Sequence, residues 1–104
     1  PKIIDVQDEN GWTPLIIAIY NNQKEVVKTL LMNGANLSIC NFKGTTPLMY
    51  AKSAYVKYKD PEIIKLLVSL DVNIYQKDYT NKNVLDYCLE NNKFELLDII
   101  MFIL

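Results

Sequence analysis

The 104-residue sequence contains neither histidine nor arginine, and all eleven of its basic residues are lysines. Without histidine there is no imidazole to activate a nucleophile or to bind a metal ion. Without arginine there is no bidentate guanidinium contact to guanine or phosphate. The formal net charge of −1 gives little attraction to nucleic acid. We therefore expect no catalysis, no metal or cofactor and no nucleic-acid partner.

Cysteine and glycine are also scarce. Cys40 and Cys88 lie 48 residues apart, which matches neither a disulfide framework nor a zinc site, so we expect reduced thiols and a cytoplasmic location. Secretion into a host cell, by a signal outside this sequence, stays open. Three glycines form no phosphate-binding loop. The longest apolar run, residues 99–104, is too short to span a bilayer, and we expect no membrane contact.

The composition that remains is that of a folded domain. Half of the residues are hydrophobic and 22% are charged, a balance typical of globular proteins rather than disordered ones. A chain of this length has room for one hydrophobic core. We expect a single domain over residues 1–104.

The sequence repeats itself with a period of 33 residues. D-E-N-G-W-T-P-L at residues 8–15 aligns with N-F-K-G-T-T-P-L at residues 41–48, and an alanine follows each Leu at the third position. Downstream, E-V-V-K at residues 25–28 aligns with E-I-I-K at residues 62–65. Such internal periodicity is typical of stacked repeat proteins.

A third, weaker copy begins at Asp78, where D-Y-T-N-K-N-V-L aligns with the earlier openings and Cys88 takes the alanine position. Gly44 and Asn81 are 37 residues apart rather than 33, because four extra residues lie between Ala51 and Glu62. The expected units are the tail of a preceding repeat (1–7), repeat 1 (8–40), repeat 2 with the insertion (41–77) and a degenerate repeat 3 (78–104).

Each unit contains signals for two short helices. Thr13 can cap a helix that Pro14 opens, and Asn22 tolerates the left-handed backbone of a reverse turn. A second helix is expected over residues 24–32, with Gly34 as its stop. In the second unit Thr46 and Pro47 repeat the first start, and Asp60 with Pro61 opens the second helix. Most aspartates occupy such turn and cap positions, so we do not interpret them as catalytic.

The insertion is rich in lysine and tyrosine. Its basic and aromatic residues are Lys52, Tyr55, Lys57, Tyr58 and Lys59. We expect an extended connection between helices with solvated lysines and packing tyrosines, because the net charge and the lack of arginine argue against a nucleic-acid strip. A protein contact at this insertion stays open.

The patterns G-x-T-P-L-x-x-A and E-V-V-K-x-L-L-x-x-G-A, repeated every 33 residues, resemble the ankyrin repeat over nearly the whole chain. The resemblance implies an all-α solenoid of helix-turn-helix units joined by short β-hairpin turns. The family's usual His after Thr-Pro-Leu is replaced here by Ile16, Met49 and Asp86. The hydrogen-bond link which that His makes between a hairpin and the neighbouring repeat is therefore not expected in this form.

The resemblance also implies that a partner protein binds at the hairpin tips and on the concave face formed by the first helices. The matching hairpin positions are Glu9, Asn10, Trp12, Phe42, Lys43, Thr45, Tyr79, Thr80 and Lys82. The outward first-helix positions are Tyr20, Asn21, Ser53, Glu90 and Asn91. Each hairpin offers one large aromatic, and we favour Trp12 as an exposed anchor. The alternative is that these aromatics only pack against the next hairpin.

The end of the chain is almost entirely apolar, since only Glu95 and Asp98 are polar between residues 94 and 104. A terminal repeat needs a polar outer face, so we expect something to cover this helix. We favour continuation of a longer protein, with a homodimer as second choice. The candidate self-association residues are Ile99, Phe102, Ile103 and Leu104.

Taken as a whole, the sequence favours a non-catalytic protein–protein interaction scaffold. Two alternatives stay open. One is a targeting or recognition segment of a larger multidomain enzyme or secreted effector, and the other is a structural spacer without a partner.

Overall fold

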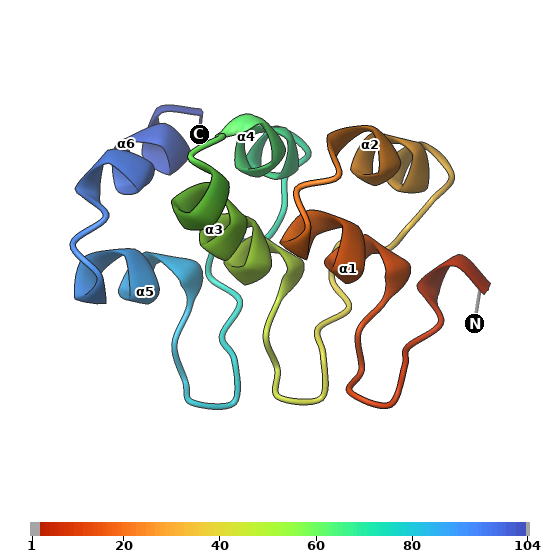
Figure 1. The fold of residues 1–104 in the computed structure, drawn as a ribbon. Coiled ribbons are helices and arrows are strands. Elements are labelled where there is room, and N and C mark those ends of the chain that lie inside the picture. Colours follow the sequence, from red (N-terminus) through yellow and green to blue (C-terminus); the bar gives the residue numbers. More distant parts are fainter. Residues whose placement is uncertain (1–2, 104) are drawn as a thin grey trace.

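The computed structural model describes residues 3–103, without the side chains of residues 102 and 103, as a row of paired helices (Figure 1). A 3-10 turn, η1 (Ile3–Asp5), precedes the helices α1 (Pro14–Tyr20), α2 (Lys24–Met32), α3 (Pro47–Tyr58), α4 (Glu62–Ser69), α5 (Val84–Glu90) and α6 (Phe94–Ile103). None of the residues from 3 to 103 forms a β-strand. The all-α solenoid is confirmed, and the repeat boundaries within it stay a prediction.

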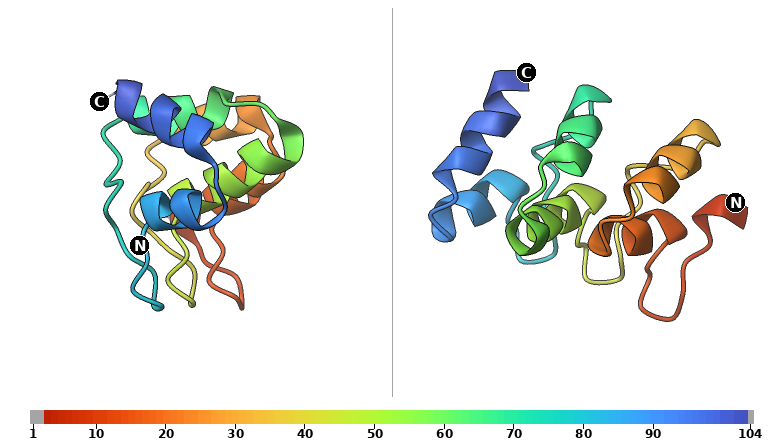
Figure 2. Two further views of the ribbon diagram at one scale, coloured as in Figure 1. Left: turned by 90° about the vertical axis from the view of Figure 1, so that its left-hand side faces the viewer. Right: turned by 45° about the horizontal axis from the view of Figure 1, so that its top comes forward.

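The helices form two layers. The first helices α1, α3 and α5 make one row, the second helices α2, α4 and α6 make the other, and three long loops project from the first row side by side (Figures 1 and 2). The buried core runs between the rows and along the stack. The loops and the first helices therefore share one face of the molecule.

Two first helices begin as their sequences predict. Thr13 Oγ1 accepts a hydrogen bond from the Ile16 N–H at 3.2 Å, and Thr46 Oγ1 accepts from the Met49 N–H at 3.2 Å. Proline occupies the first helical position of α1 and of α3, where a missing N–H leaves no bond unmade.

The weak third copy forms a complete first helix by a different cap. Asn83 Oδ1 accepts from the Asp86 N–H, and Asp86 Oδ2 accepts from the Asn83 N–H, both at 2.9 Å. This reciprocal capping box replaces the Thr-Pro start of the other repeats. Asn81 adopts the left-handed backbone, with φ of 68°, where the earlier loops have glycine.

The four-residue insertion is helical, and the expectation of an extended connection is wrong. Helix α3 has 12 residues against 7 in α1. Four residues are close to one turn of an α-helix, and residues 52–58 contain neither glycine nor proline to interrupt it. Lys59 ends the helix in the left-handed conformation, with φ of 56°. Asp60 Oδ1 then accepts from the Glu62 N–H at 3.0 Å, and α4 starts at Glu62 rather than at Pro61.

The small-residue positions are buried between helices. Ala18, Ala51 and Cys88 are each at most 1% exposed. Burial raises the pKa of the Cys88 thiol, which opposes formation of a reactive thiolate. Ile16 and Met49, at the family's histidine position, also lie in the interior. These positions therefore hold the repeats together by apolar packing.

Candidate partner-binding surface

Each projecting loop is organised by one side chain at its start. Asp8 Oδ1 accepts hydrogen bonds from the N–H groups of Asn10 and Trp12, both at 2.9 Å. Asn41 makes the same pair of contacts in the second loop, and Asp78 does so in the third. Short carboxylate and amide side chains stabilise turns in this way, so the three loops share one shape.

Neighbouring loops are joined through their main chains. The Phe42 N–H donates to the Asn10 carbonyl at 3.1 Å, and the Tyr79 N–H donates to the Lys43 carbonyl at 3.4 Å. The Phe42 ring lies over Gly11, where a Cβ would come within 2.7 Å of its Cδ1 atom. Main-chain bonds thus link successive hairpins without the family's histidine.

The loop aromatics both pack and remain exposed. Phe42 lies against Gly11 and Tyr79 lies against Gly44, yet their side chains are 59% and 75% exposed. The two alternatives weighed for these rings are therefore compatible. A partner can contact the outer face of each ring while its inner face covers the preceding loop.

Trp12 differs from these two rings, and its expected exposure needs correction. It aligns with Thr45 and Lys82 rather than with Phe42 and Tyr79, and it is half-buried. Its ring centroid lies 5.2 Å from that of Tyr20 on α1 and 4.8 Å from that of Tyr50 on α3. Tyr20 and Tyr50 are themselves 5.8 Å apart in an edge-to-face arrangement. Trp12, Tyr20 and Tyr50 form one aromatic cluster across repeats 1 and 2.

A groove of about 410 Å³ opens beside this cluster, between the first two loops. Its lining residues are Glu9, Asn10, Trp12, Asn41, Phe42, Lys43 and Tyr50. Five of these seven are among the residues that the sequence marked for partner binding. This volume lies within the range of ligand-binding clefts.

The extra turn of α3 contributes a cation near the cluster. Lys57 Nζ lies 6.0 Å from the ring centroid of Tyr20 and 5.3 Å from that of Tyr58. An ammonium group at such a distance from an aromatic face is attracted by the ring. The insertion thus places a positive charge beside the Trp12–Tyr20–Tyr50 cluster.

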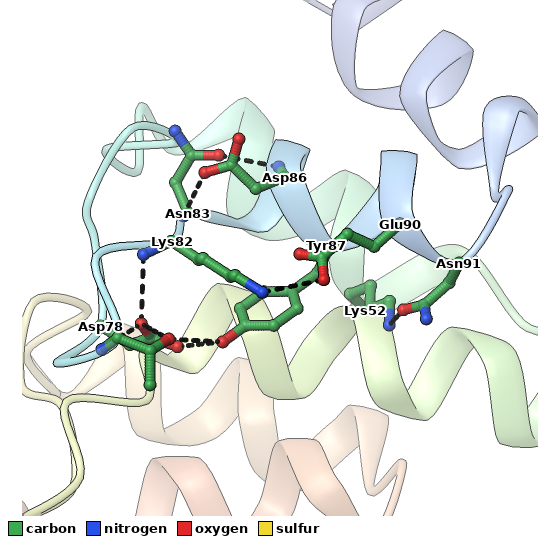
Figure 3. Close-up of polar contacts among 9 residues, drawn as sticks. Lys52, Asp78, Lys82, Asn83, Asp86, Tyr87, Glu90 and Asn91 are labelled. Carbon is green, nitrogen blue, oxygen red and sulfur yellow. Dashed lines mark hydrogen bonds and ion pairs between the residues drawn. The ribbon is translucent and has the colours of Figure 1, made fainter.

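The other end of the concave face is polar (Figure 3). Lys82 Nζ pairs with Glu90 Oε1 at 2.8 Å within repeat 3, and the pair raises the pKa of Lys82. Lys52 Nζ on α3 donates to Asn91 Oδ1 at 2.6 Å, which connects repeats 2 and 3. A smaller groove of about 140 Å³ lies between these repeats. The concave face is therefore aromatic toward repeat 1 and polar toward repeat 3.

Two tyrosines that the sequence interpretation did not include tie the loops to the first helices. Asn41 Nδ2 donates to the Tyr50 hydroxyl at 3.0 Å, and the Tyr87 hydroxyl donates to Asp78 Oδ2. Tyr50 and Tyr87 occupy the same repeat position, one residue after the family's histidine. This shared repeat position, occupied by tyrosine in repeats 2 and 3, is the sequence signal that could have identified both residues.

The Asp78 carboxylate is the most strongly perturbed acid of this network. Burial by itself would raise its pKa, but hydrogen bonds from Thr80, Tyr87 and the loop main chain lower the pKa to about 2. The hydrogen bond between the Tyr87 hydroxyl and the Asp78 carboxylate raises the pKa of Tyr87. The charged form of Asp78 is thus part of the folded loop.

The structure locates the remaining predicted residues as follows. Exposed side chains are those of Glu9, Asn10, Tyr20, Asn21, Phe42, Lys43, Ser53, Tyr79, Thr80, Glu90 and Asn91. Thr45 and Lys82, like Trp12, are half-buried, because their position in each loop lies next to the first helix. Lys52 and Lys57 were not predicted as site residues, and they lie on the same face as the aromatic cluster and the polar network.

The predicted self-association residues divide into two groups. Ile99 is half-buried and packs against the core, because Leu96 and Ile100 turn that side of α6 inward. It is therefore less available than expected. The side chains of Phe102 and Ile103, and all of Leu104, lie outside the described residues. The exposed large apolar residues of α5 and α6 are instead Leu89, Phe94 and Met101, at 54%, 56% and 53%.

Within the described part of the chain, no helix is both long and apolar enough to cross a membrane. Between residues 3 and 103, no group of three or more Cys, Asp and Glu side chains is arranged to hold a metal ion.

Stacked two-helix units with projecting loops define the class of ankyrin-type repeat proteins. Comparison with known families agrees, because the profile described as "Ankyrin repeats (3 copies)" matches residues 2–78. The chain belongs to the ankyrin-repeat family. Ankyrin repeats are generally protein–protein interaction modules.

Relatives of the chain are diverse. It is 35% identical over 103 residues to the human transient receptor potential cation channel subfamily A member 1. The aligned segment covers 96% of this chain and 9% of the channel. A putative ankyrin repeat protein of Acanthamoeba polyphaga mimivirus is 32% identical over 101 residues, 96% of this chain and 13% of that protein. Palmitoyltransferase AKR1 of Saccharomyces cerevisiae is 33% identical over 89 residues, 86% of this chain and 11% of the enzyme. The chain thus spans a small part of the length of these relatives.

Proposed function

We propose that this chain is a non-catalytic scaffold that binds another protein across its concave face. The observation that carries the proposal is the aromatic surface formed by the exposed rings of Phe42, Tyr79 and Tyr20 together with the half-buried rings of Trp12 and Tyr50 that contact Tyr20. Large, rigid aromatic side chains bury much area at low rotamer cost and are frequent anchors of protein interfaces.

Binding would depend on shape and on buried area. The loop main chains are held by hydrogen bonds to the side chains of Asp8, Asn41 and Asp78 and by the main-chain bonds between loops. The surface therefore loses little conformational freedom when a partner docks. The polar network of repeat 3 would act at the rim of the interface, where hydrogen bonds and charges favour a particular partner. No bond in the partner is made or broken.

Photo-crosslinking tests this proposal in the cells that produce the protein. We expect p-benzoylphenylalanine at Tyr20 to give a discrete adduct with another protein, because Tyr20 is exposed on the concave face. The same group at Tyr75, an exposed tyrosine after α4, serves as the control and should give no such adduct. The double substitution Trp12→Ala and Phe42→Ala should abolish the adduct while circular dichroism stays helical. An adduct that survives this substitution, or that forms equally at Tyr75, would exclude the concave face.

A larger parent protein is the second candidate. The palmitoyltransferase relative is an enzyme by its name, and the aligned segment is 11% of that enzyme. In this alternative the chain is the recognition segment of a multidomain enzyme or secreted effector, and any catalysis lies outside these residues. The full reading frame decides between the two.

We also infer that a second copy of the chain can cover the end of the stack. Leu89 is 54% exposed, whereas Ile19, its equivalent in repeat 1, is fully buried against the next repeat. We also propose a reducing, cytoplasmic location for the chain, because Cys40 and Cys88 are spaced unlike a disulfide framework and both are free thiols.

A further inference from the structure

We propose that the groove between the first two repeats selects an acidic segment of the partner. In this arrangement an aromatic or aliphatic side chain rests on the cluster of Trp12, Tyr20 and Tyr50, and an adjacent Asp or Glu pairs with Lys57. This inference rests on the proposed function and specifies the chemistry of the partner at the same surface.

The aromatic cluster provides the anchor site. Tyr20 is 42% exposed, Trp12 and Tyr50 are half-buried, and the groove beside them has a volume of about 410 Å³. The three rings are fixed by mutual edge contacts, so they present a pre-organised apolar surface. Such a surface favours an aromatic or aliphatic side chain.

The distribution of charge favours an acidic neighbour. On the outer helices, Lys24 pairs with Asp60 at 2.9 Å and Lys28 pairs with Glu62 at 3.1 Å. By contrast, Lys43 at the groove and Lys57 beside the cluster have no carboxylate within salt-bridge distance among the described residues. Lys43 lines the groove, Lys57 lies near the Tyr20 ring, and Glu9 is the acidic residue among those that line the groove.

A basic anchor is disfavoured for the same reason. Lys57 already occupies the position near the Tyr20 ring that a partner's ammonium or guanidinium group would seek. A second cation there would be repelled at close range and would gain little from the ring. The complementary partner group beside Lys57 is a carboxylate.

The selectivity would be specific to this stack because it depends on the insertion. Lys57 lies on the extra turn of α3, and the equivalent helix α1 ends at Tyr20 without such a turn. Helix α5, with 7 residues, also lacks it. One local lengthening of the chain thus gives one of the three repeats a charged side chain beside the aromatic cluster.

Selection from a random-peptide phage library on the immobilised protein tests the inference. We expect the selected peptides to combine an aromatic or aliphatic residue with an adjacent Asp or Glu. A synthetic peptide of that sequence should change the fluorescence of Trp12, the only tryptophan of the chain, which reports directly on the groove.

Matched variants locate the contact. Lys57→Glu should lower the affinity for the peptide about fivefold to tenfold, since it converts an attraction into a repulsion. Tyr20→Ala should lower the affinity about tenfold or more, as expected for an anchor residue. The controls Lys65→Glu, an equal change of charge on α4, and Tyr75→Ala should leave the affinity unchanged. All four side chains are exposed, so circular dichroism should show intact helices.

The outcomes separate this inference from the proposed function. Selected peptides that bind at Trp12 but carry no acid, or carry Lys or Arg beside the anchor, overturn the acidic selectivity and leave the concave face as the binding surface. Peptides that neither change Trp12 fluorescence nor respond to Tyr20→Ala overturn both. A library that yields no binder also overturns both.

Discussion

At the residue scale, one loop position shows how carboxylate and amide groups are exchanged without loss of structure. Asp8, Asn41 and Asp78 each accept the same two main-chain N–H groups. Asn41 reaches Tyr50 through its amide nitrogen, whereas Asp78 reaches Tyr87 as an acceptor. The geometry is shared, and what differs is a titratable charge.

This difference predicts how stability depends on pH. The folded-state pKa of Asp78, about 2, lies below its ordinary value of 3.8, so its stabilising contribution is complete above pH 3.8 and is lost as the pH falls through about 2. In the wild type, protonation of Asp78 at low pH should lower the free energy of unfolding by about 1–2 kcal/mol. The variant Asp78→Asn has no carboxylate at this position and should not show that loss. Urea titrations between pH 2 and pH 5 measure the change in slope.

Two matched tyrosine variants provide the control. Tyr87→Phe removes a donor to the Asp78 carboxylate, so its loss of stability should set in at higher pH. Tyr50→Phe removes the equivalent hydroxyl beside an amide and should lower stability without changing the pH slope. Equal pH slopes for wild type, Asp78→Asn and Tyr87→Phe would contradict the role of Asp78.

At the scale of single elements, the sequence predicted a helix well wherever it contains a capping residue at the start or a turn residue at the end. Thr13 and Thr46 cap as expected, α2 covers the expected residues 24–32, and Asn22 adopts the left-handed conformation. Helix α3 was predicted too short because its continuation has no signal of its own. Only the size of the insertion, close to one helical turn, indicated it.

The cap of α5 gives a testable value for the third repeat. Asn83→Ala should lower the free energy of unfolding by about 1 kcal/mol, since it removes the side-chain half of the capping box. Asn83→Thr, which restores the residue type of repeats 1 and 2, should recover most of that loss. Chemical denaturation followed by circular dichroism measures both, and equal midpoints for Asn83→Ala and wild type would show that the cap contributes nothing.

At the scale of the whole molecule, the sequence predicted which face would carry the exposed side chains but not how they would group. Aligning the repeats placed Trp12 in a loop, yet its contacts with Tyr20 and Tyr50 depend on the approach of α1 and α3. The position of Lys57 depends on the path of the insertion. Such contacts join residues distant along the chain, and periodicity alone does not encode them.

The exposed end of the stack predicts self-association. We expect the solution mass, measured by light scattering, to rise above that of the monomer with concentration, because Leu89 and Met101 expose apolar surface. Leu89→Lys with Met101→Lys should hold the chain at the monomer mass. Repeat 2 already has Lys52 at the Leu89 position, which makes the change structurally acceptable.

The control for this experiment is Leu70→Lys, at an apolar side chain of similar exposure, 47%, that follows α4. It should leave the concentration dependence intact. A wild-type mass equal to the monomer at every concentration would exclude self-association.

The main-chain bonds between loops run in one direction, since the second and the third loop each donate an N–H to a carbonyl of the loop before them. These two bonds use no side-chain atom, so they do not depend on which residues stand at the donating positions, here Phe42 and Tyr79. Other links between loops do use side chains, since Gln7 Nε2 donates to the Cys40 carbonyl and Gln76 Nε2 donates to the Ser38 carbonyl. A tandem duplication of one unit would therefore keep the main-chain links whatever the residue type, whereas the glutamine links would have to be kept or replaced.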